Sequence, residues 1–353
     1  MDLSTTGKGG GPFTSTSRTM HSGLTKKYEF KTIYYKTEIG SGISIKRIKD
    51  LAAQIKEINP DIVHFTGLQL SGFHMALACK LAGVKNTVVT VRGFSGDAIY
   101  FNKIKKAITT YILEPLTLIL SKRVIGVSNY VISRRMVRLL AKNKRTAIYN
   151  FPPKFDNKFD KEIPFREELD LQPNDILVVT VARIIKDKGY HIFDEAILKF
   201  KGHQNVKFII VGNGTYLPEM EEKLADMIQS KQVFLLGYRS DISYILHSCN
   251  IFVLPTLHET LSVALLEASQ YGLALVASRT GGVPEIVEHN YNGKLVPTGD
   301  VQKLYEAIVE LVEDKAKTNA FGENAKKKVQ TKFSNRGIEN KLDQVYQSLL
   351  ERK

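Results

Sequence analysis

The clearest evidence for the fold of this chain is the sequence ILVVTVARIIKDKGY, residues 176–190. Its first six residues form a run of apolar and β-branched side chains, which predicts a strand buried on both faces. A short polar loop follows and ends at Gly189, and a helical pattern starts at Tyr190. A buried strand that leads through a short loop into a helix is the repeating unit of a parallel sheet.

The same rhythm extends outward over most of the 353 residues. Apolar β-branched runs alternate with amphipathic stretches, so we expect parallel sheets covered by helices on both faces. The predicted strands are Glu29–Tyr35, Asp61–Phe65, Thr87–Val91, Arg123–Val127, Ile176–Val181, Val206–Val211, Val233–Leu236, Ile251–Leu254 and Ala274–Ala277. The predicted helices include Ile45–Ile58, Phe73–Leu81, Tyr190–Phe200 and Pro218–Ile228.

The rhythm breaks once, at FPPKFDNKFDKEIP, residues 151–164, whose three prolines and many charges are typical of a linker. The length also suits two α/β domains better than one. We therefore predict an N-terminal domain over residues 1–165 and a C-terminal domain over residues 166–334. A last helix, Asn335–Leu350 within residues 335–353, is expected to cross back to the N-terminal domain. Only six residues precede Gly7, so the first strand is either very short or begins before this sequence.

The net charge of +14 is distributed unevenly along the chain. Residues 1–165 contain 27 Lys and Arg against 11 Asp and Glu, whereas the remainder has a net charge of −2. A basic half attracts nucleic acid, anionic lipid or an anionic substrate, although charge can also serve solubility alone. Two cysteines rule out a disulfide framework. Residues 1–13 show no apolar signal core, and the longest apolar run, Tyr111–Leu120, is too short to span a bilayer. These features predict a cytoplasmic protein.

Two cations follow the strand quoted first. Arg183 and Lys188 lie five positions apart, just past the carboxyl end of that strand, where open α/β sheets bind ligands. Such a pair can hold a diphosphate and stabilise the negative charge that develops as it leaves. Taken alone, the pair is better explained as two surface cations before a helix.

Two carboxylates stand eight positions apart in PTLHETLSVALLEA, residues 255–268. If a helix begins near Leu261, Glu259 lies in the entering loop and Glu267 in the second helical turn. The amides of Thr260, Leu261 and Ser262 would then point at an anion. The alternative is a helix-capping glutamate and an unrelated surface glutamate.

Glycine-rich turns complete the pattern. Gly212–Gly214 follows a predicted strand, but Leu217 occupies the third glycine position of a dinucleotide fingerprint, so an NAD site is poorly supported. Gly281–Gly282 precedes a short helix. Near the N-terminus, Gly7, Gly9, Gly10 and Gly11 precede a Ser/Thr-rich helix start and could approach a phosphate closely, or belong to a terminus without function.

Taken in order, these segments resemble the retaining glycosyltransferases of the GT-B class, family 4 type. The resemblance covers most of residues 170–350 and includes VARIIKDKGY, FIIVGNGTYLPEMEEKL, the Glu259/Glu267 block and GGVPEIVEHNYNGKLVPTGD. It is looser in the first half, where DIVHFTG, TVVTVRGFSGD and VIGVSNY match. It implies two Rossmann-like doubly wound domains facing a cleft, and transfer from a nucleotide-diphosphate sugar.

The resemblance also implies roles for single residues. Arg183 and Lys188 would bind the donor diphosphate, Glu267 the ribose, and Glu259 with the amides after it the transferred sugar. Donor contacts are further expected at Gly212 and, from the other domain, at Gly10 and Gly11. Members of the family need no metal or other cofactor, and this sequence has no Asp-x-Asp pair and no histidine pair with ligand spacing.

Three positions depart from the family pattern. Thr260 and Leu261 replace the commoner Gly-Phe, Asn250 stands where aspartate is common, and Arg92 replaces a histidine that contacts the sugar. Arginine cannot act as a base at neutral pH but can pair with a carboxylate or a phosphate. Arg92 could also belong to a plain surface loop or a salt bridge.

The predicted partners are a nucleotide-sugar donor, with UDP favoured, and a glycan or lipid-linked acceptor in polysaccharide or glycoconjugate assembly. A Rossmann oxidoreductase does not explain the Glu259/Glu267 pair. Few aromatics interleave with the basic residues, which disfavours nucleic acid as a partner. A nucleotide-sugar-binding protein without transfer remains open.

The segment around residues 100–122 suggests where an anionic membrane would be contacted. Lys103, Lys105 and Lys106 precede the apolar run Tyr111–Leu120, as in a helix lying in a membrane interface. We therefore expect a cytoplasmic protein that can attach peripherally to the inner face of a membrane. In the alternative, Ile108, Ile112 and Leu116 simply face the protein core.

Overall fold

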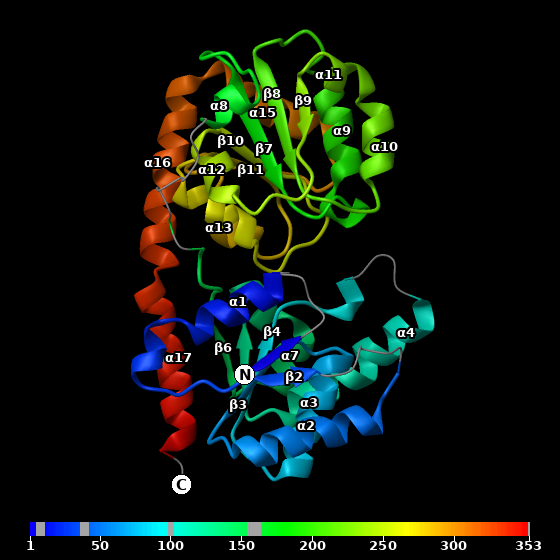
Figure 1. Ribbon diagram of the computed structural model, residues 1–353, viewed down its shortest axis with the longest axis vertical. Coiled ribbons are helices and arrows are strands. Elements are labelled where there is room, and N and C mark those ends of the chain that lie inside the picture. The colour runs from blue at the N-terminus through cyan, green and yellow to red at the C-terminus, as the bar shows by residue number, and fades with distance from the viewer. Residues whose placement is uncertain (5–10, 36–41, 98–101, 154, 156–163, 352–353) are drawn as a thin grey trace. The chain divides into compact units, whose positions relative to one another are not determined.

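The computed structural model describes residues 1–4, 11–35, 42–97, 102–153, 155 and 164–351, and these form two compact units (Figure 1). The N-terminal unit comprises Met1–Phe151 together with Phe333–Lys353, and the C-terminal unit is Pro152–Lys332. The division falls at the first residue of the proline-rich segment, whereas the sequence placed it near residue 165.

The C-terminal unit contains a parallel sheet of six strands in the order β12-β11-β10-β7-β8-β9. Its core strands are apolar on both faces, and Leu177, Val178 and Val179 of β7 are completely buried. Helices therefore cover both faces of the sheet. The strands are β7 Ile176–Val181, β8 Val206–Val211, β9 Val233–Leu235, β10 Ile251–Leu254, β11 Ala274–Ser278 and β12 Gly293–Val296. The helices are α8 Phe165–Glu168, η4 Lys186–Lys188, α9 Tyr190–Leu198, α10 Leu217–Lys223, α11 Ala225–Gln229, α12 Ile242–His247, α13 Val263–Gln270, α14 Val283–Ile286, α15 Val301–Glu313 and α16 Lys315–Lys332.

This strand order places β7 beside both β8 and β10. The chain runs from β7 outward to β9 and then returns to β10 on the other side of β7. The loops that follow β7 and β10 consequently leave the sheet in opposite directions. A crevice at the carboxyl ends of such strands is where doubly wound sheets bind their ligands.

The N-terminal unit holds a four-stranded parallel sheet, β3-β4-β5-β6, and a short parallel pair, β1-β2. The strands are β1 Asp2–Ser4, β2 Ile33–Tyr35, β3 Val63–Thr66, β4 Thr87–Val91, β5 Arg123–Gly126 and β6 Arg145–Ala147. The helical segments are α1 Gly11–Met20, η1 Gly23–Lys26, α2 Ile45–Ile58, α3 Leu70–Ala82, η2 Ser95–Asp97, α4 Lys103–Ile108, η3 Thr109–Leu113, α5 Glu114–Leu120, α6 Asn129–Ser133 and α7 Arg135–Leu140.

The last helix, α17 (Asn335–Leu350), belongs to the N-terminal unit. One face of α17 is apolar and packs against Val88 of β4 and Ile125 of β5. The packed residues of α17 are Ile338, Leu342, Val345, Tyr346 and Leu349. Polar contacts add to this packing, since Tyr28 donates a hydrogen bond to Asp343 at 2.7 Å.

Most predicted elements appear in the structure, but some of their bounds differ. The strand predicted over Glu29–Tyr35 is only Ile33–Tyr35, and the helix predicted over Pro218–Ile228 is divided at Leu224. The short strands β6 and β12 were not predicted, because neither Arg145–Ala147 nor Gly293–Val296 forms an apolar run long enough to stand out.

Within the described ranges, none of the helices combines the length and the apolar character that crossing a bilayer requires. Both cysteines are free thiols.

Candidate functional site

Four loops meet at the carboxyl edge of the C-terminal sheet, and glycines allow them to approach closely. A Cβ on Gly189 would lie 1.9 Å from the carbonyl oxygen of Pro255, and one on Gly281 would lie 1.7 Å from that of Glu259. Both glycines have positive φ, +76° and +54°. Only glycine meets both demands, so the loops after β7, β10 and β11 are locked together at these positions.

An ion pair joins the loops after β7 and β10. The ammonium of Lys188 lies 2.8 Å from Oε2 of Glu259, and both side chains are largely shielded from solvent. The other carboxylate oxygen of Glu259 accepts a hydrogen bond from the amide of Thr260 at 3.0 Å. Two of the residues predicted to act on the donor are thus brought into contact at the point where the strand order reverses.

Arg183 lies on the same edge, with a different environment. The residues on either side of it are hydrogen-bonded to β8 and the loop after it: the amide of Ala182 donates to the carbonyl of Val211, and the amide of Ile184 donates to the carbonyl of Asn213. The side chain itself is exposed and, among the residues that the structure describes, makes no hydrogen bond or ion pair. The backbone at Arg183 is therefore held in place, while its side chain is available to an anionic ligand.

Asp187 joins the same two loops, a role that was not predicted from the sequence. Its backbone carbonyl accepts the amide hydrogen bond of Leu257 at 3.0 Å, and its carboxylate lies 3.3 Å from Nε2 of His258. The contact joins residues 71 positions apart, so a single sequence offered no signal for it. Asp187 fixes the loop that carries Glu259 relative to the loop that carries Lys188.

The helix start near Glu259 differs from the prediction. Helix α13 begins at Val263, two residues later than expected, because Ser262 is its N-cap and accepts the amide of Leu265 at 3.2 Å. The amide of Thr260 is engaged by Glu259, and the side chains of Leu261 and Ser262 are buried. The helix therefore starts two residues later than predicted, and Glu267 lies in its second turn. Donor contacts by the amides of Thr260, Leu261 and Ser262 stay a prediction.

Gly212 is required for packing. Its φ is +142°, and a Cβ there would lie 1.9 Å from the carbonyl oxygen of Ala182. The glycine lets the loop after β8 lie against the backbone beside Arg183. A donor contact by Gly212 stays a prediction.

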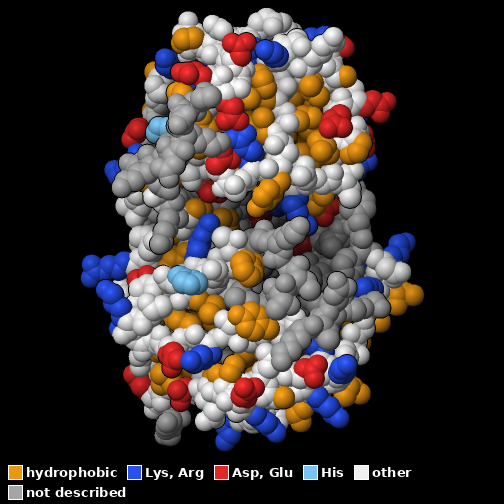
Figure 2. Space-filling view, in the orientation of Figure 1, with side chains coloured by type: hydrophobic (Ala, Val, Ile, Leu, Met, Phe, Trp, Pro, Cys, Tyr) orange, Lys and Arg blue, Asp and Glu red, His pale blue; other side chains and the backbone are white. Residues whose placement is uncertain are grey.

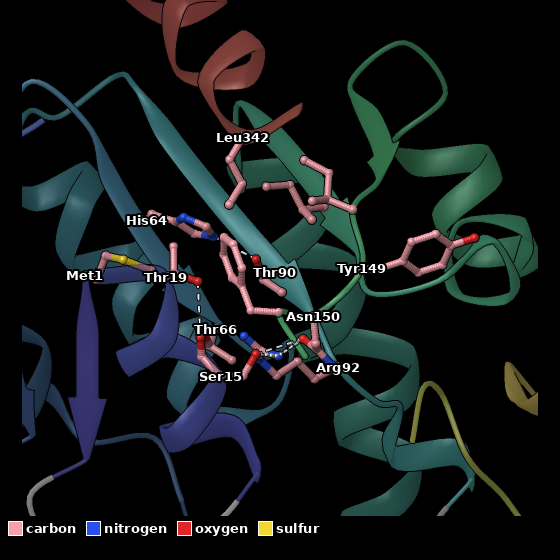
Figure 3. A pocket seen from close by; sticks show the side chains of 13 residues that line it. Met1, Ser15, Thr19, His64, Thr66, Thr90, Arg92, Tyr149, Asn150 and Leu342 are labelled. Carbon is pink, nitrogen blue, oxygen red and sulfur yellow. Dashed lines mark hydrogen bonds between the residues drawn. The ribbon is translucent and has the colours of Figure 1, made fainter. Parts of the chain in front are cut away.

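Arg92 follows β4 in the N-terminal unit and borders a small polar cavity of about 20 Å³, room for one water molecule (Figure 3). Its guanidinium donates to Ser15 Oγ at 2.9 Å and to the amide oxygen of Asn150. Ser15 in turn donates to Asn150 at 2.9 Å. Arg92 is half-buried and held by Ser15 and Asn150, so it does not belong to a plain surface loop.

His64 occupies the far side of this cavity. Its two ring nitrogens lie 2.7 Å from the hydroxyls of Tyr346 and Thr90 (Figure 3). Burial, with the nearby charges of the Met1 amino group and Arg92, lowers the pKa of His64 to about 3. His64 is therefore neutral near pH 7. It connects the sheet to α17.

Of the two N-terminal glycines predicted to contact the donor, Gly10 and Gly11, the structure describes only Gly11. Gly11 is the first residue of α1. Gly10, with Gly7 and Gly9, lies outside the described residues. No cluster of three or more potential metal ligands occurs in the part of the chain that the structure covers.

Comparison with known proteins identifies the family. The family described as "Glycosyl transferases group 1" matches residues 161–328, and "Glycosyl transferase 4-like" matches residues 15–123. The chain belongs to the group 1 glycosyltransferases of the family 4 type.

Individual relatives agree with this assignment. The chain is 26% identical over 335 residues to the capsular polysaccharide biosynthesis glycosyltransferase CapM of Staphylococcus aureus, covering 90% of this chain and 87% of CapM. It is 28% identical over 327 residues to the UDP-Gal:alpha-D-GlcNAc-diphosphoundecaprenol alpha-1,3-galactosyltransferase of Escherichia coli, covering 86% and 80%. Among solved structures, Anabaena HepE in complex with UDP and glucose superposes with a TM-score of 0.73 at 22% identity, covering 90% and 86%. The predicted GT-B fold of two parallel α/β domains is confirmed.

Proposed function

We propose that this glycosyltransferase moves a sugar from a UDP-sugar to a glycan or lipid-linked acceptor, retains the anomeric configuration and uses no metal ion. The observation that carries the proposal is the Lys188–Glu259 pair beside exposed Arg183 at the reversal point of a doubly wound sheet. The complex of HepE with UDP and glucose and the UDP-galactose donor of the E. coli relative support the choice of donor.

In this proposal the cations receive the diphosphate. Arg183 is exposed and its backbone is held at the sheet edge, so its planar guanidinium can reach and bind two phosphate oxygens. Lys188 has three donors, and one of them is used by Glu259. The remaining donors can contact the leaving phosphate and stabilise its developing charge.

The carboxylates would hold the two sugars of the donor. Glu267, in the second turn of α13, would accept hydrogen bonds from the ribose, and Glu259 from the transferred sugar. Both oxygens of Glu259 are already engaged, by Lys188 and by the Thr260 amide. Such a carboxylate suits a hydrogen-bond acceptor better than a covalent nucleophile, which favours attack from the leaving-group face. The anomeric configuration of the product, read by NMR early in the reaction, tests retention.

Metal independence follows from the same cations. If Arg183 and Lys188 replace a divalent ion, transfer should continue at an unchanged rate in excess EDTA. Loss of activity with EDTA that Mg²⁺ or Mn²⁺ restores would refute this part of the proposal.

The acceptor is assigned from the relatives and from charge. The E. coli relative acts on a diphosphoundecaprenol-linked sugar, and the basic residues of this chain are concentrated in its first half. A lipid-linked acceptor would bring the enzyme to an anionic membrane surface as a peripheral protein.

One experiment separates the proposal from its main alternative. UDP release from UDP-sugars is measured with and without extracts that contain lipid-linked acceptors. Release that depends on acceptor is expected. Tight binding of the donor without any release, under all acceptor conditions, would instead indicate a nucleotide-sugar-binding protein.

A further inference from the structure

The segment Lys103–Leu120 forms a continuous helical run, α4, η3 and α5, with large apolar side chains on its exposed side. Its inward face contains polar residues: Thr109, Glu114 and Thr117 are all buried. Glu114 accepts the amide of Ser95 at 2.6 Å, and Thr117 donates to the carbonyl of Leu68 at 3.1 Å. These three polar side chains thus face the interior of the unit, beside buried Leu113 and Leu118.

The outward face is apolar. Six large hydrophobic side chains are exposed, at intervals of three or four residues apart from the adjacent pair Tyr111 and Ile112, and Ile104 and Tyr111 are 73% and 79% exposed. This spacing puts them on one side of the helical run. We call them the apolar stripe: Ile104, Ile108, Tyr111, Ile112, Leu116 and Ile119. The alternative that Ile108, Ile112 and Leu116 face the core is therefore wrong.

Basic residues surround the stripe. Residues 102–145 contain 11 Lys and Arg, and their one acidic residue, Glu114, is buried. Lys103, Lys105 and Lys122 are exposed beside the stripe. Helix α7 packs beside α5 and adds exposed Leu139 and Arg138. This stretch of sequence is therefore strongly basic.

The helical run is placed for contact with an external surface. Helix α4 lies at the margin of the N-terminal unit, on the side away from α17 (Figure 1). In the same orientation, hydrophobic and Lys or Arg side chains project together from that margin (Figure 2).

We propose that the apolar stripe and the lysines around it form a docking surface for an anionic lipid bilayer. Isoleucines would enter the boundary between headgroups and acyl chains while the lysine ammonium groups bind lipid phosphates. A phosphate backbone of nucleic acid would pair with the lysines but leave a stripe of isoleucines uncovered. An anionic lipid surface accounts for both the lysines and the apolar stripe.

Docking of this kind would bring the enzyme to a lipid-linked acceptor. Only this purpose of the docking rests on the proposed function. The physical binding can be measured without any turnover. Lysine residues near an anionic surface each strengthen binding about fivefold, and the apolar stripe adds a contribution that salt does not screen.

The test is cosedimentation of the full chain with vesicles. Phosphatidylcholine vesicles containing phosphatidylglycerol should bind the protein at low salt, and phosphatidylcholine alone should not. The variant Lys103→Glu/Lys105→Glu/Lys106→Glu should lose at least about tenfold in binding. Its matched control, Lys46→Glu/Lys49→Glu/Lys56→Glu, makes the same charge change at exposed positions of α2 and should lose much less.

A second variant tests the apolar half. Ile104→Ser/Ile112→Ser changes two exposed side chains, so its melting temperature should match that of the parent. It should lose vesicle binding several-fold, including the part that persists at high salt.

Three outcomes would overturn the docking surface: no binding to anionic vesicles at low salt, equal loss in the α2 control, or binding to a soluble acidic polysaccharide while vesicles are ignored. Donor-dependent transfer to a short soluble acceptor is measured in parallel. Intact transfer without vesicle binding would refute the docking alone, and vesicle binding without transfer would refute the proposed function alone.

Discussion

At the scale of single residues, the candidate donor site depends on cations that differ in their surroundings. Arg183 is exposed without a described side-chain partner, Lys188 is paired with Glu259, and Lys186 forms an ion pair with Glu219 at 3.0 Å. These three cations lie within six residues of one another. Single substitutions can therefore distinguish the loss of a specific donor contact from the loss of one positive charge in this loop.

We predict that Arg183→Ala loses at least about tenfold in donor affinity or turnover, because a charge-assisted contact contributes about 1.5–3 kcal/mol. The melting temperature should not change, since the side chain is exposed. Glu267→Ala should show a comparable kinetic loss. Lys186→Ala, which removes a cation from the same loop, is the control and should leave donor affinity close to that of the parent. Unchanged kinetics in both Arg183→Ala and Glu267→Ala would remove the donor-site assignment.

Arg92 supports a prediction about substrate choice. It is held by Ser15 and Asn150 next to a polar cavity, so its guanidinium is oriented by neutral partners. If Arg92 reads an anionic group of a substrate, Arg92→His should change the ranking of donors and acceptors more than it changes stability. Activity assays on a panel of neutral and acidic sugars, together with thermal melts, measure both. Equal loss on every substrate with a large fall in melting temperature would indicate a structural role.

At the scale of elements, glycines determine how closely the loops of the C-terminal sheet approach. Gly281 has a φ of +54° and lies where a Cβ would be 1.7 Å from the Glu259 carbonyl. The amide of the next residue, Gly282, donates a hydrogen bond to that same carbonyl at 3.0 Å. The position of Glu259 therefore depends on the loop after β11.

We predict that Gly281→Ala destabilises the protein by more than about 2 kcal/mol, because it adds a steric clash to the strain of a positive φ. Gly299→Ala is the matched control: its φ is +84° but nothing lies within 4 Å of the added Cβ, so only about 1 kcal/mol should be lost. Urea unfolding of both variants gives the comparison. Similar losses in the two variants would show that the contact with Glu259 adds nothing.

At the scale of the whole molecule, the end of the chain completes the N-terminal unit. Tyr346 of α17 bonds to His64 of β3 across 282 positions of sequence, and Tyr149 packs on Phe333 with ring centroids 4.6 Å apart. Helix α17 therefore belongs to the core of the unit in which the chain begins.

This connection predicts an acid-sensitive fold. The pKa of His64 is about 3 in the folded protein and about 6.5 when unfolded, so only the unfolded chain takes up a proton between these values. The contribution of neutral His64 to the free energy of unfolding is therefore complete above about pH 6.5. It decreases as the pH falls toward 3, by about 2 kcal/mol at about pH 5. His64→Gln should reduce this dependence, as urea unfolding at about pH 7 and about pH 5 can measure. An equally steep loss in the variant would assign the acid sensitivity to other groups.

The sequence alone was sufficient for the class of fold and for the residue types of the candidate site. Strands such as Ile176–Val181 are apolar on both faces, and local periodicity reveals such elements without any tertiary information. The strand–loop–helix context likewise placed Arg183 and Lys188 at the sheet edge where ligands bind. Local signals of this kind depend on neighbours within one or two turns of chain.

Only the tertiary structure decided features that depend on distant contacts. The pairing of Lys188 with Glu259, the bond of Asp187 to the loop before Glu259 and the start of α13 at Val263 arise from loops brought together by strand order. The orientation of Ile108 and Ile112 was ambiguous in sequence, because a helical apolar stripe looks the same whether it faces a core or a lipid surface. The burial of Thr109, Glu114 and Thr117 on the opposite face turned the isoleucines outward.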